Sequence, residues 1–237
     1  MATDTTKGTI RVMQEFDQDN IHTGSANGVS WHVTLDNSGT LAPVASAELQ
    51  AASVTGGADN NMNELAYEYL SWRAQDGFMS AELRVDMTSI TLAAVSFGFN
   101  DDVLEDSNTL PVELCGTTFT SNAGTFIGFI YDPDATNDNW HAFMVDDCND
   151  TTMAIACLNT GVAPVADTAN TLKVVVYDQG ACNQTRAEFY IDGKLEVEMA
   201  SAIDRDILMT PHFGHENRVG CAATANLHYI EVKKSRP

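Results

Sequence analysis

The last third of the chain alternates between apolar and polar residues. From Ala187 the sequence reads AEFYIDGKLEVEM. Alternation with a period of two places one face of a β-strand in a core and the other face in water. Asp192 and Gly193 interrupt the pattern and can supply the positive φ angles of a tight hairpin turn. The pattern predicts strands at 187–191 and 194–199, with these side chains buried: Phe189, Ile191, Leu195 and Val197.

The same alternation recurs along most of the chain. It is longest from Met79 to Met87, where Leu83 and Val85 should face the core. The segment 59–73 fits either a helix or a strand, and its aromatic residues favour the strand. Further strands are expected at 9–13, 29–35, 95–99, 125–131, 140–145, 153–158, 172–177 and 226–232. We predict an all-β fold, an antiparallel two-sheet sandwich of about a dozen strands with little helix.

One domain accounts for this pattern. A chain of 237 residues with 44% hydrophobic composition can bury a full core. No linker-like, low-complexity or repeated stretch divides it. We expect residues 1–15 to be an N-terminal arm or the lead-in to the first strand, and residues 16–237 to form a single β-sandwich domain. The segment through Phe16 would then be free to lie across a neighbouring molecule.

The chain is strongly acidic, with 33 Asp and Glu against 12 Lys and Arg and a formal net charge of −21. A nucleic-acid binder needs a basic face, and the only basic cluster is Lys233, Lys234 and Arg236. Attraction to anionic lipid is disfavoured for the same reason. No apolar run approaches the length of a membrane span, and the start, MATDTTKGTI, lacks the features of a secretion signal. We expect synthesis in the cytoplasm and neither nucleic acid nor membrane as a partner.

Several phrases of the sequence resemble virion proteins of tailed bacteriophages that belong to the concanavalin-A-like jelly-roll superfamily. In that superfamily an early strand carries a phrase such as MSAELRV, and a late hairpin reads like FYIDGK. The resemblance covers residues 60–235 and implies a jelly-roll sandwich. It rests on these segments: NELAYEYLSWRAQDGFMSAELRVDM, FIGFIYDPDATNDNWHAF, LNTGVAPVADTANTLKVVV, AEFYIDGKLEV and PHFGHENR.

The resemblance implies a non-enzymatic structural protein that decorates and stabilises the outer capsid surface of a phage particle. Its contacts would repeat at a symmetry axis, with the major capsid protein and copies of itself, as a dimer or trimer, as partners. An acidic surface suits the outside of a shell, because the inside faces packaged DNA. The virion, after synthesis in the host cytoplasm, is the expected location. The alternative is a carbohydrate-binding or glycan-active host-attachment protein of the same fold.

No catalytic set is expected. Retaining glycoside hydrolases of this shape carry an E-x-D-x-x-E phrase, which is absent here. Glu196 and Glu198 come nearest and are interpreted as a solvated strand face. Glu82, Arg84 and Asp86 alternate on one strand and are interpreted as a polar sheet face with ion pairs.

No metal or other cofactor is expected. Asp132, Asp134 and Asp138, with Asn137 and Asn139 nearby, are a weak calcium candidate, because the loop lacks the glycine and terminal glutamate of an EF-hand. Turn-forming roles explain these residues better. The remaining group, His212, His215 and Cys221, is disfavoured as a metal site, because the two histidines should point to opposite faces of an extended segment.

The cysteines and tryptophans complete the candidates. The five cysteines are an odd number, so at least one is free or pairs with another chain. Cys148 and Cys157 flank a turn and are the best disulfide candidate. Trp31 and Trp72 lie in apolar-patterned strands and should be core residues. Under the glycan-binding alternative, Trp140 is the candidate platform for stacking on a sugar.

Overall fold

The computed structural model describes residues 8–16, 21–23, 31–44, 50–67, 70–75, 77–101, 109–146, 157–180 and 185–236, with only the backbone described at 21–23. Over these ranges the chain forms 18 strands and no helix. Consequently no helix of the described chain could cross a membrane. The expected all-β architecture is confirmed, with more strands than the dozen predicted.

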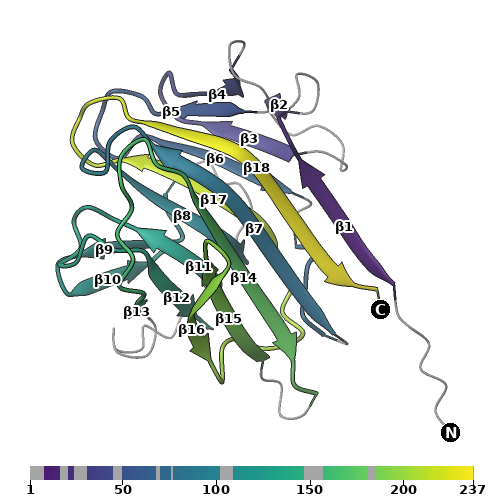
Figure 1. Ribbon diagram of the computed structural model, residues 1–237. Coiled ribbons are helices and arrows are strands. Elements are labelled where there is room, and N and C mark those ends of the chain that lie inside the picture. The colour runs from purple at the N-terminus through teal and green to yellow at the C-terminus, as the bar shows by residue number, and fades with distance from the viewer. Residues whose placement is uncertain are drawn as a thin grey trace, which may run out of the picture.

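The strands form two sheets that pack face to face (Figure 1). Sheet A has the order β16 (Lys194–Met199), β15 (Thr185–Ile191), β14 (Asn170–Asp178), β7 (Phe78–Met87), β18 (Thr224–Ser235), β5 (Ala51–Val54), β4 (Thr40–Pro43), with β1 (Thr9–Gln14) also paired to β18. Sheet B has the order β13 (Cys157–Asn159), β12 (His141–Val145), β11 (Phe126–Tyr131), β8 (Ala93–Asn100), β17 (Thr210–Asn217), β6 (Met62–Tyr67), β3 (Trp31–Leu35), β2 (Ile21–Thr23). Among the described pairs of strands within these sheets, β2 with β3 is parallel and the others are antiparallel.

A small hairpin stands outside both sheets. It consists of β9 (Val112–Cys115) and β10 (Thr118–Ser121). Val112 and Leu114 of this hairpin pack with Phe126, Ile130 and Phe143 in a second hydrophobic cluster. These three residues belong to sheet B, on the face that points away from sheet A. The hairpin therefore covers part of the outer face of sheet B.

The main core lies between the sheets. Leu83 and Val85 of β7 are buried there, as predicted, and so are Phe189 and Ile191 of β15. Phe129 of sheet B meets Phe189 of sheet A edge to face, with ring centroids 5.4 Å apart. Aromatic contacts of this kind add stability beyond the area that they bury. The core is thus the product of alternating inward positions on both sheets.

The hairpin formed by β15 and β16 differs from the prediction in one respect. Asp192 and Gly193 have φ angles of 51° and 79°, as the turn requires. The register then shifts, because Phe189 lies opposite Val197 but Tyr190 lies opposite Leu195. The bulge turns Leu195 outward to 44% exposure, and Val197 is only half-buried against the core. The predicted burial of Leu195 is wrong, because a bulge breaks the strict alternation.

The N-terminal residues belong to the sandwich. β1 pairs with β18 from Thr9 opposite Ser235 to Gln14 opposite Ile230. Phe16 is 2% exposed and lies in the main core. The expectation that the segment through Phe16 is free to lie across a neighbour is therefore wrong for residues 9–16, while residues 1–7 lie outside the described ranges.

The segment 59–73, which fits either a helix or a strand by sequence, contains strand β6. Strands β3, β7, β8, β11, β12, β14 and β18 lie where alternation predicted them, within one to three residues at each end. Strand β17 was not predicted. Its sequence, TPHFGHEN, is buried on both faces and so carries no alternation of burial.

The bulge leads to a test of the core. Phe189→Ala should lower the free energy of unfolding by about 3–5 kcal/mol, because it removes a ring from the middle of the sandwich. Leu195→Ala, two residues beyond the turn on the paired strand, should change it by less than about 1 kcal/mol. Urea denaturation of both variants would measure this. Equal losses would mean that Leu195 is packed in the core.

Candidate functional site

The outer face of sheet A carries an ordered array of polar and aromatic side chains. In the register, Lys173 of β14 lies between Tyr190 of β15 and Glu82 of β7. Tyr177, four residues further along β14, lies opposite Arg186. These side chains alternate with the core residues of their strands and therefore point outward. This is the face turned toward the viewer in Figure 1.

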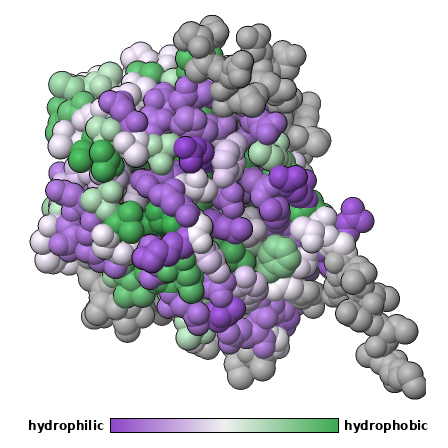
Figure 2. Space-filling model, viewed as in Figure 1, coloured by the Kyte–Doolittle hydropathy of each residue, from purple (hydrophilic) through white to green (hydrophobic). Residues whose placement is uncertain are grey.

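A cleft of about 360 Å³ opens among these side chains. We call it the sheet-A cleft, and its lining residues are Glu82, Thr171, Lys173, Val175, Tyr177, Tyr190 and Gly193. Val175 points outward yet is only 6% exposed, so it forms an apolar floor between taller neighbours. On the surrounding face, hydrophilic residues alternate with smaller hydrophobic patches (Figure 2). The volume lies within the range of small-molecule sites.

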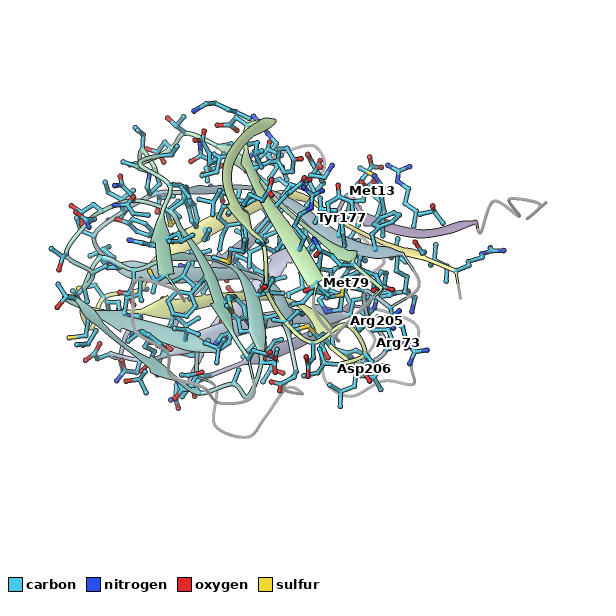
Figure 3. The ribbon with its side chains drawn as sticks, turned by 90° about the horizontal axis from the view of Figure 1, so that it is seen from below. Met13, Arg73, Met79, Tyr177, Arg205 and Asp206 are labelled. Atoms are coloured by element: carbon cyan, nitrogen blue, oxygen red, sulfur yellow. The ribbon has the colours of Figure 1, made fainter. Side chains whose placement is uncertain are left out.

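The turn between β15 and β16 closes one end of the cleft. The carboxylate of Asp192 accepts hydrogen bonds from the backbone N–H of Thr171 (2.8 Å) and from the side chain of Asn170 (2.9 Å). At the other end of β14, Arg205 forms a two-pronged contact with Asp178, at 2.7 and 2.5 Å. Figure 3, a view from below, shows Tyr177 on the sheet-A side of the sandwich and Met79 nearer its middle. Both ends of β14 are thus fixed by side chains.

Glu188 organises the aromatic side of the cleft. Its carboxylate accepts a hydrogen bond from the hydroxyl of Tyr190 (2.7 Å) and pairs with Arg186 (2.9 Å). The guanidinium of Arg186 in turn lies 5.0 Å from the centroid of the Tyr177 ring. Hydrogen bonding to Glu188, together with burial, raises the pKa of Tyr190 to about 12. Tyr190 therefore stays protonated, and its ring is held in one orientation.

Glu82 of β7 orients the side chains on the other side of the cleft, as Glu188 does on the aromatic side. It pairs with Lys173 at 3.3 Å and accepts a hydrogen bond from the hydroxyl of Tyr229 at 2.7 Å. Burial, together with this hydrogen bond, raises the pKa of Tyr229 to about 12. An ionised carboxylate offers about four acceptor positions and an ammonium three donors. Glu82 and Lys173 therefore keep unused hydrogen-bonding capacity toward the cleft.

A bulge in β18 adds a histidine to this face. The register of β18 against β7 shifts between Leu227 and Tyr229. His228 contacts Asp86 at 2.8 Å, and Asn226 donates to the other oxygen of the same carboxylate at 2.8 Å. Glu82, Arg84 and Asp86 therefore lie on a polar face laced with ion pairs and hydrogen bonds, as predicted.

The other carboxylates considered from the sequence lie on the edge strand. Glu196 pairs with Lys194 at 2.9 Å, and Glu198 pairs with Arg186 at 3.4 Å. Glu198 is exposed, which agrees with a solvated face, whereas Glu196 is half-buried beside the bulge. Neither side chain lines the sheet-A cleft.

Trp140 cannot serve as a stacking platform on the surface. It is 1% exposed, donates from Nε1 to Asn170 at 3.2 Å and packs edge to face on Tyr131 at 5.6 Å. Trp31 and Trp72, expected in the core, are 2% and 0% exposed.

The calcium candidate residues are divided by the structure. Asp132 is fully buried, and its carboxylate contacts Arg218 at 2.6 Å and the backbone N–H of Leu114 at 3.1 Å. Asp134 and Asp138 are exposed. In the described ranges, no three His, Cys, Asp or Glu side chains converge as metal ligands would. Asp132 instead holds the β9–β10 hairpin against the end of sheet B.

Arg218 sits among several carboxylates. Besides Asp132 it contacts Glu216, which is fully buried, and lies 3.8 Å from Glu113 of β9. Glu216 also accepts a hydrogen bond from the backbone N–H of Leu110 at 3.3 Å. Burial raises the pKa of Glu216 to about 7, although Arg218 opposes the shift.

Among the residues that the structure describes, the histidines and cysteines form no shared metal site. His212 faces out of sheet B toward Ser96, while His215 faces the interior and contacts Ser53, so their predicted opposite orientation is confirmed. Cys157 is buried, and Cys115 and Cys221 are exposed. Cys148 lies outside the described residues, so its pairing with Cys157 stays a prediction.

Comparisons with known proteins identify the fold. No family model and no curated protein sequence matches the chain. Among solved structures, the carbohydrate recognition domain of Emp47p is similar with a TM-score of 0.60 and 12% identity, over 99% of this chain and 100% of that one. Peanut lectin has a TM-score of 0.53 and 12% identity over 95% and 97%. An endo-β-1,4-glucuronan lyase from the fungus Trichoderma reesei has a TM-score of 0.56 and 10% identity over 86% and 90%.

The fold is a concanavalin-A-like jelly-roll sandwich. The expected fold class, an antiparallel jelly-roll sandwich, is thus confirmed. At 10–12% identity the likeness carries nothing further, and none of these three structures is described as a phage protein. Within this fold, the sheet-A cleft is a candidate binding site, because it combines aromatic, apolar and paired charged side chains.

The buried carboxylate predicts a dependence of stability on pH. The folded-state pKa of Glu216 is about 7 and the ordinary value is 4.5, so the folded protein holds this proton more tightly than the unfolded chain. Its stabilising contribution is complete below pH 4.5 and is lost as the pH rises through 7. Glu216→Gln should therefore gain about 1–3 kcal/mol relative to the wild type between pH 4.5 and 8.

Chemical denaturation of both proteins at several pH values would measure that difference. Glu198→Gln, at an exposed position on sheet A, is the matched control for the loss of one carboxylate. A difference between Glu216→Gln and the wild type that does not change with pH would show that folding does not raise the pKa of Glu216.

Proposed function

We propose that this protein binds a neutral oligosaccharide in the sheet-A cleft. The observation that carries the proposal is the lining of the cleft, in which two tyrosines and an apolar floor at Val175 stand beside the paired side chains of Lys173 and Glu82. Such a site combines aromatic surface with a few well-placed polar groups, as small-molecule sites generally do.

The chemistry of the lining suits a sugar ring. A pyranose presents C–H groups on its faces and hydroxyls around its edge. The rings of Tyr177 and Tyr190 and the methyl groups of Val175 offer apolar contacts. Lys173 can donate hydrogen bonds to sugar hydroxyls, and Glu82 can accept hydrogen bonds from them. The tyrosine rings are already fixed by Arg186 and Glu188, so little conformational entropy is lost on binding.

The charge balance favours a neutral ligand. Lys173 is paired with Glu82, and Arg186 is paired with Glu188. The cleft therefore has no excess of positive charge to offset a chain whose net charge is −21. A polyanionic glycan would be repelled by the field of the whole protein.

The fold is compatible with this proposal, since two of the similar structures are a carbohydrate recognition domain and a lectin. Glycan binding was the alternative to capsid decoration in the sequence analysis. Nothing in the described residues favours decoration, so that role, its capsid partner and the virion location stay predictions.

A glycan array followed by isothermal titration calorimetry would test the proposal. A neutral oligosaccharide should bind, with an affinity insensitive to added salt, because the cleft carries no net charge. Tyr190→Ala and Lys173→Ala should each raise the Kd about tenfold or more, equivalent to about 1.4 kcal/mol. Val219→Ala, an exposed apolar residue that is not part of the cleft lining, should leave the Kd unchanged.

Tyr190→Phe separates the roles of ring and hydroxyl. The variant keeps the ring but loses the hydrogen bond to Glu188, so it should bind more tightly than Tyr190→Ala and less tightly than the wild type. Binding only to acidic glycans would contradict the proposed ligand class, and binding unaffected by both Ala variants would contradict the site.

A further inference from the structure

Three side chains from neighbouring strands form a hydrogen-bonded chain on the outer face of sheet B. The Nδ1 atom of His212 (β17) lies 2.7 Å from Oε1 of Glu64 (β6), and its Nε2 atom lies 2.9 Å from Oγ of Ser96 (β8). All three are buried, with Ser96 at 0%, His212 at 1% and Glu64 at 8% exposure.

The strand register brings the three residues together. Ser96 and Glu64 lie opposite Gly214 from its two sides, and His212 is two residues away on the same strand and face. A Cβ atom at Gly214 would stand 2.7 Å from Oγ of Ser96 and 2.9 Å from Nε2 of His212. A glycine is therefore required here, because the imidazole and the hydroxyl occupy the space above it.

The partners of the ring determine its tautomer. An ionised carboxylate can only accept hydrogen bonds. Nδ1 of His212 therefore carries the ring proton and donates a hydrogen bond to Glu64. Nε2 is then free to accept from the hydroxyl of Ser96. This is the arrangement in which a histidine can act as a base toward a serine while a carboxylate holds it in place.

The chain contains a natural control for this arrangement. Ser53 and His215 also form a buried pair, with Oγ 3.1 Å from Nδ1. Among the described residues, no carboxylate contacts His215, and Ser53 additionally accepts a hydrogen bond from Asn63 at 3.0 Å. Burial lowers the pKa of His215 to about 4. The Ser53 pair therefore lacks the third member that makes the Ser96 group a relay.

We propose that Ser96, His212 and Glu64 form a latent nucleophilic site that hydrolyses carboxylic esters with an apolar acyl chain. Oγ of Ser96 bonds to the ester carbonyl carbon while its proton passes to Nε2 of His212. The carbon–oxygen bond to the alcohol breaks, and the alcohol takes that proton. Water then bonds to the acyl carbon, giving a proton to His212, and Oγ leaves and takes it back, so that acid and alcohol are the products.

The β9–β10 hairpin explains both the latency and the acyl chemistry. In the register, Ile130 of β11 lies opposite Ser96, and the hairpin packs on Ile130, Phe126 and Phe143. Raising the hairpin would uncover this apolar surface directly beside the serine. Phe119 of β10 holds the hairpin by an edge-to-face contact with Phe143, with centroids 5.0 Å apart.

A fluorophosphonate probe, followed by mapping of the labelled peptide, would test the proposal on the full chain. Ser96 should be labelled slowly in the wild type and at least tenfold faster in Phe119→Ala, in which the hairpin is held less firmly. His212→Gln and Glu64→Gln, made in the Phe119→Ala background, should reduce the labelling rate at least tenfold. Ser53 should remain unlabelled throughout. Hydrolysis of p-nitrophenyl butyrate should follow the same order.

Circular dichroism and thermal melting would establish that each variant is folded. Should Glu64→Gln or His212→Gln fail to fold, the identity of the labelled peptide in the wild type still tests the proposal. Absence of label on Ser96 in both the wild type and Phe119→Ala would overturn the proposal. So would labelling of Ser96 that is independent of His212. Either result would leave the three side chains as a structural network.

Discussion

The packing of two sheets against each other is the constraint on which the rest of the structure depends. Phe129 and Phe189 meet across the interface, and every strand that contributes to it must place alternate side chains inward. The intervening positions then necessarily point outward. The outward positions of β7, β14 and β15 in sheet A are therefore free for polar and aromatic residues, and the sheet-A cleft is built from them.

The two outer faces meet different physical demands. On sheet A most charged groups reach water, although Glu188 and Glu231 are buried, and pairs such as Lys173 with Glu82 contribute little to stability each. On sheet B the outer face is buried, so a polar group there must find a partner inside the protein. Glu64, His212 and Ser96 satisfy one another in this way, and Asp132 and Glu216 share Arg218. Because these groups are buried, they depend on one another for hydrogen bonds, and the pKa of Glu216 is raised.

Alternation in the sequence predicted the long strands of both sheets, but not β4 and β5 of sheet A or β17 of sheet B. Phe189 and Leu83 could be assigned to the core because their strands are solvated on one side. Strand β17 is buried on both sides and contains Pro211 and Gly214, so neither alternation nor β-propensity marks it. Bulges have no signature in alternation either. The bulge opposite Phe189 and Tyr190 turned Leu195 outward, against expectation.

The candidate sites were still harder to find, because strand pairing joins residues that are far apart in the chain. Glu82 was recognised as an outward residue, but Lys173 and Tyr190 become its neighbours only through the pairing of β7, β14 and β15. Glu64, Ser96 and His212 are likewise adjacent only through the order β8, β17, β6. The closest signal in the sequence was Gly214, two residues after His212 in a segment that must be extended. A residue without a side chain at that point leaves room for side chains from both neighbouring strands, and this is how the structure uses it.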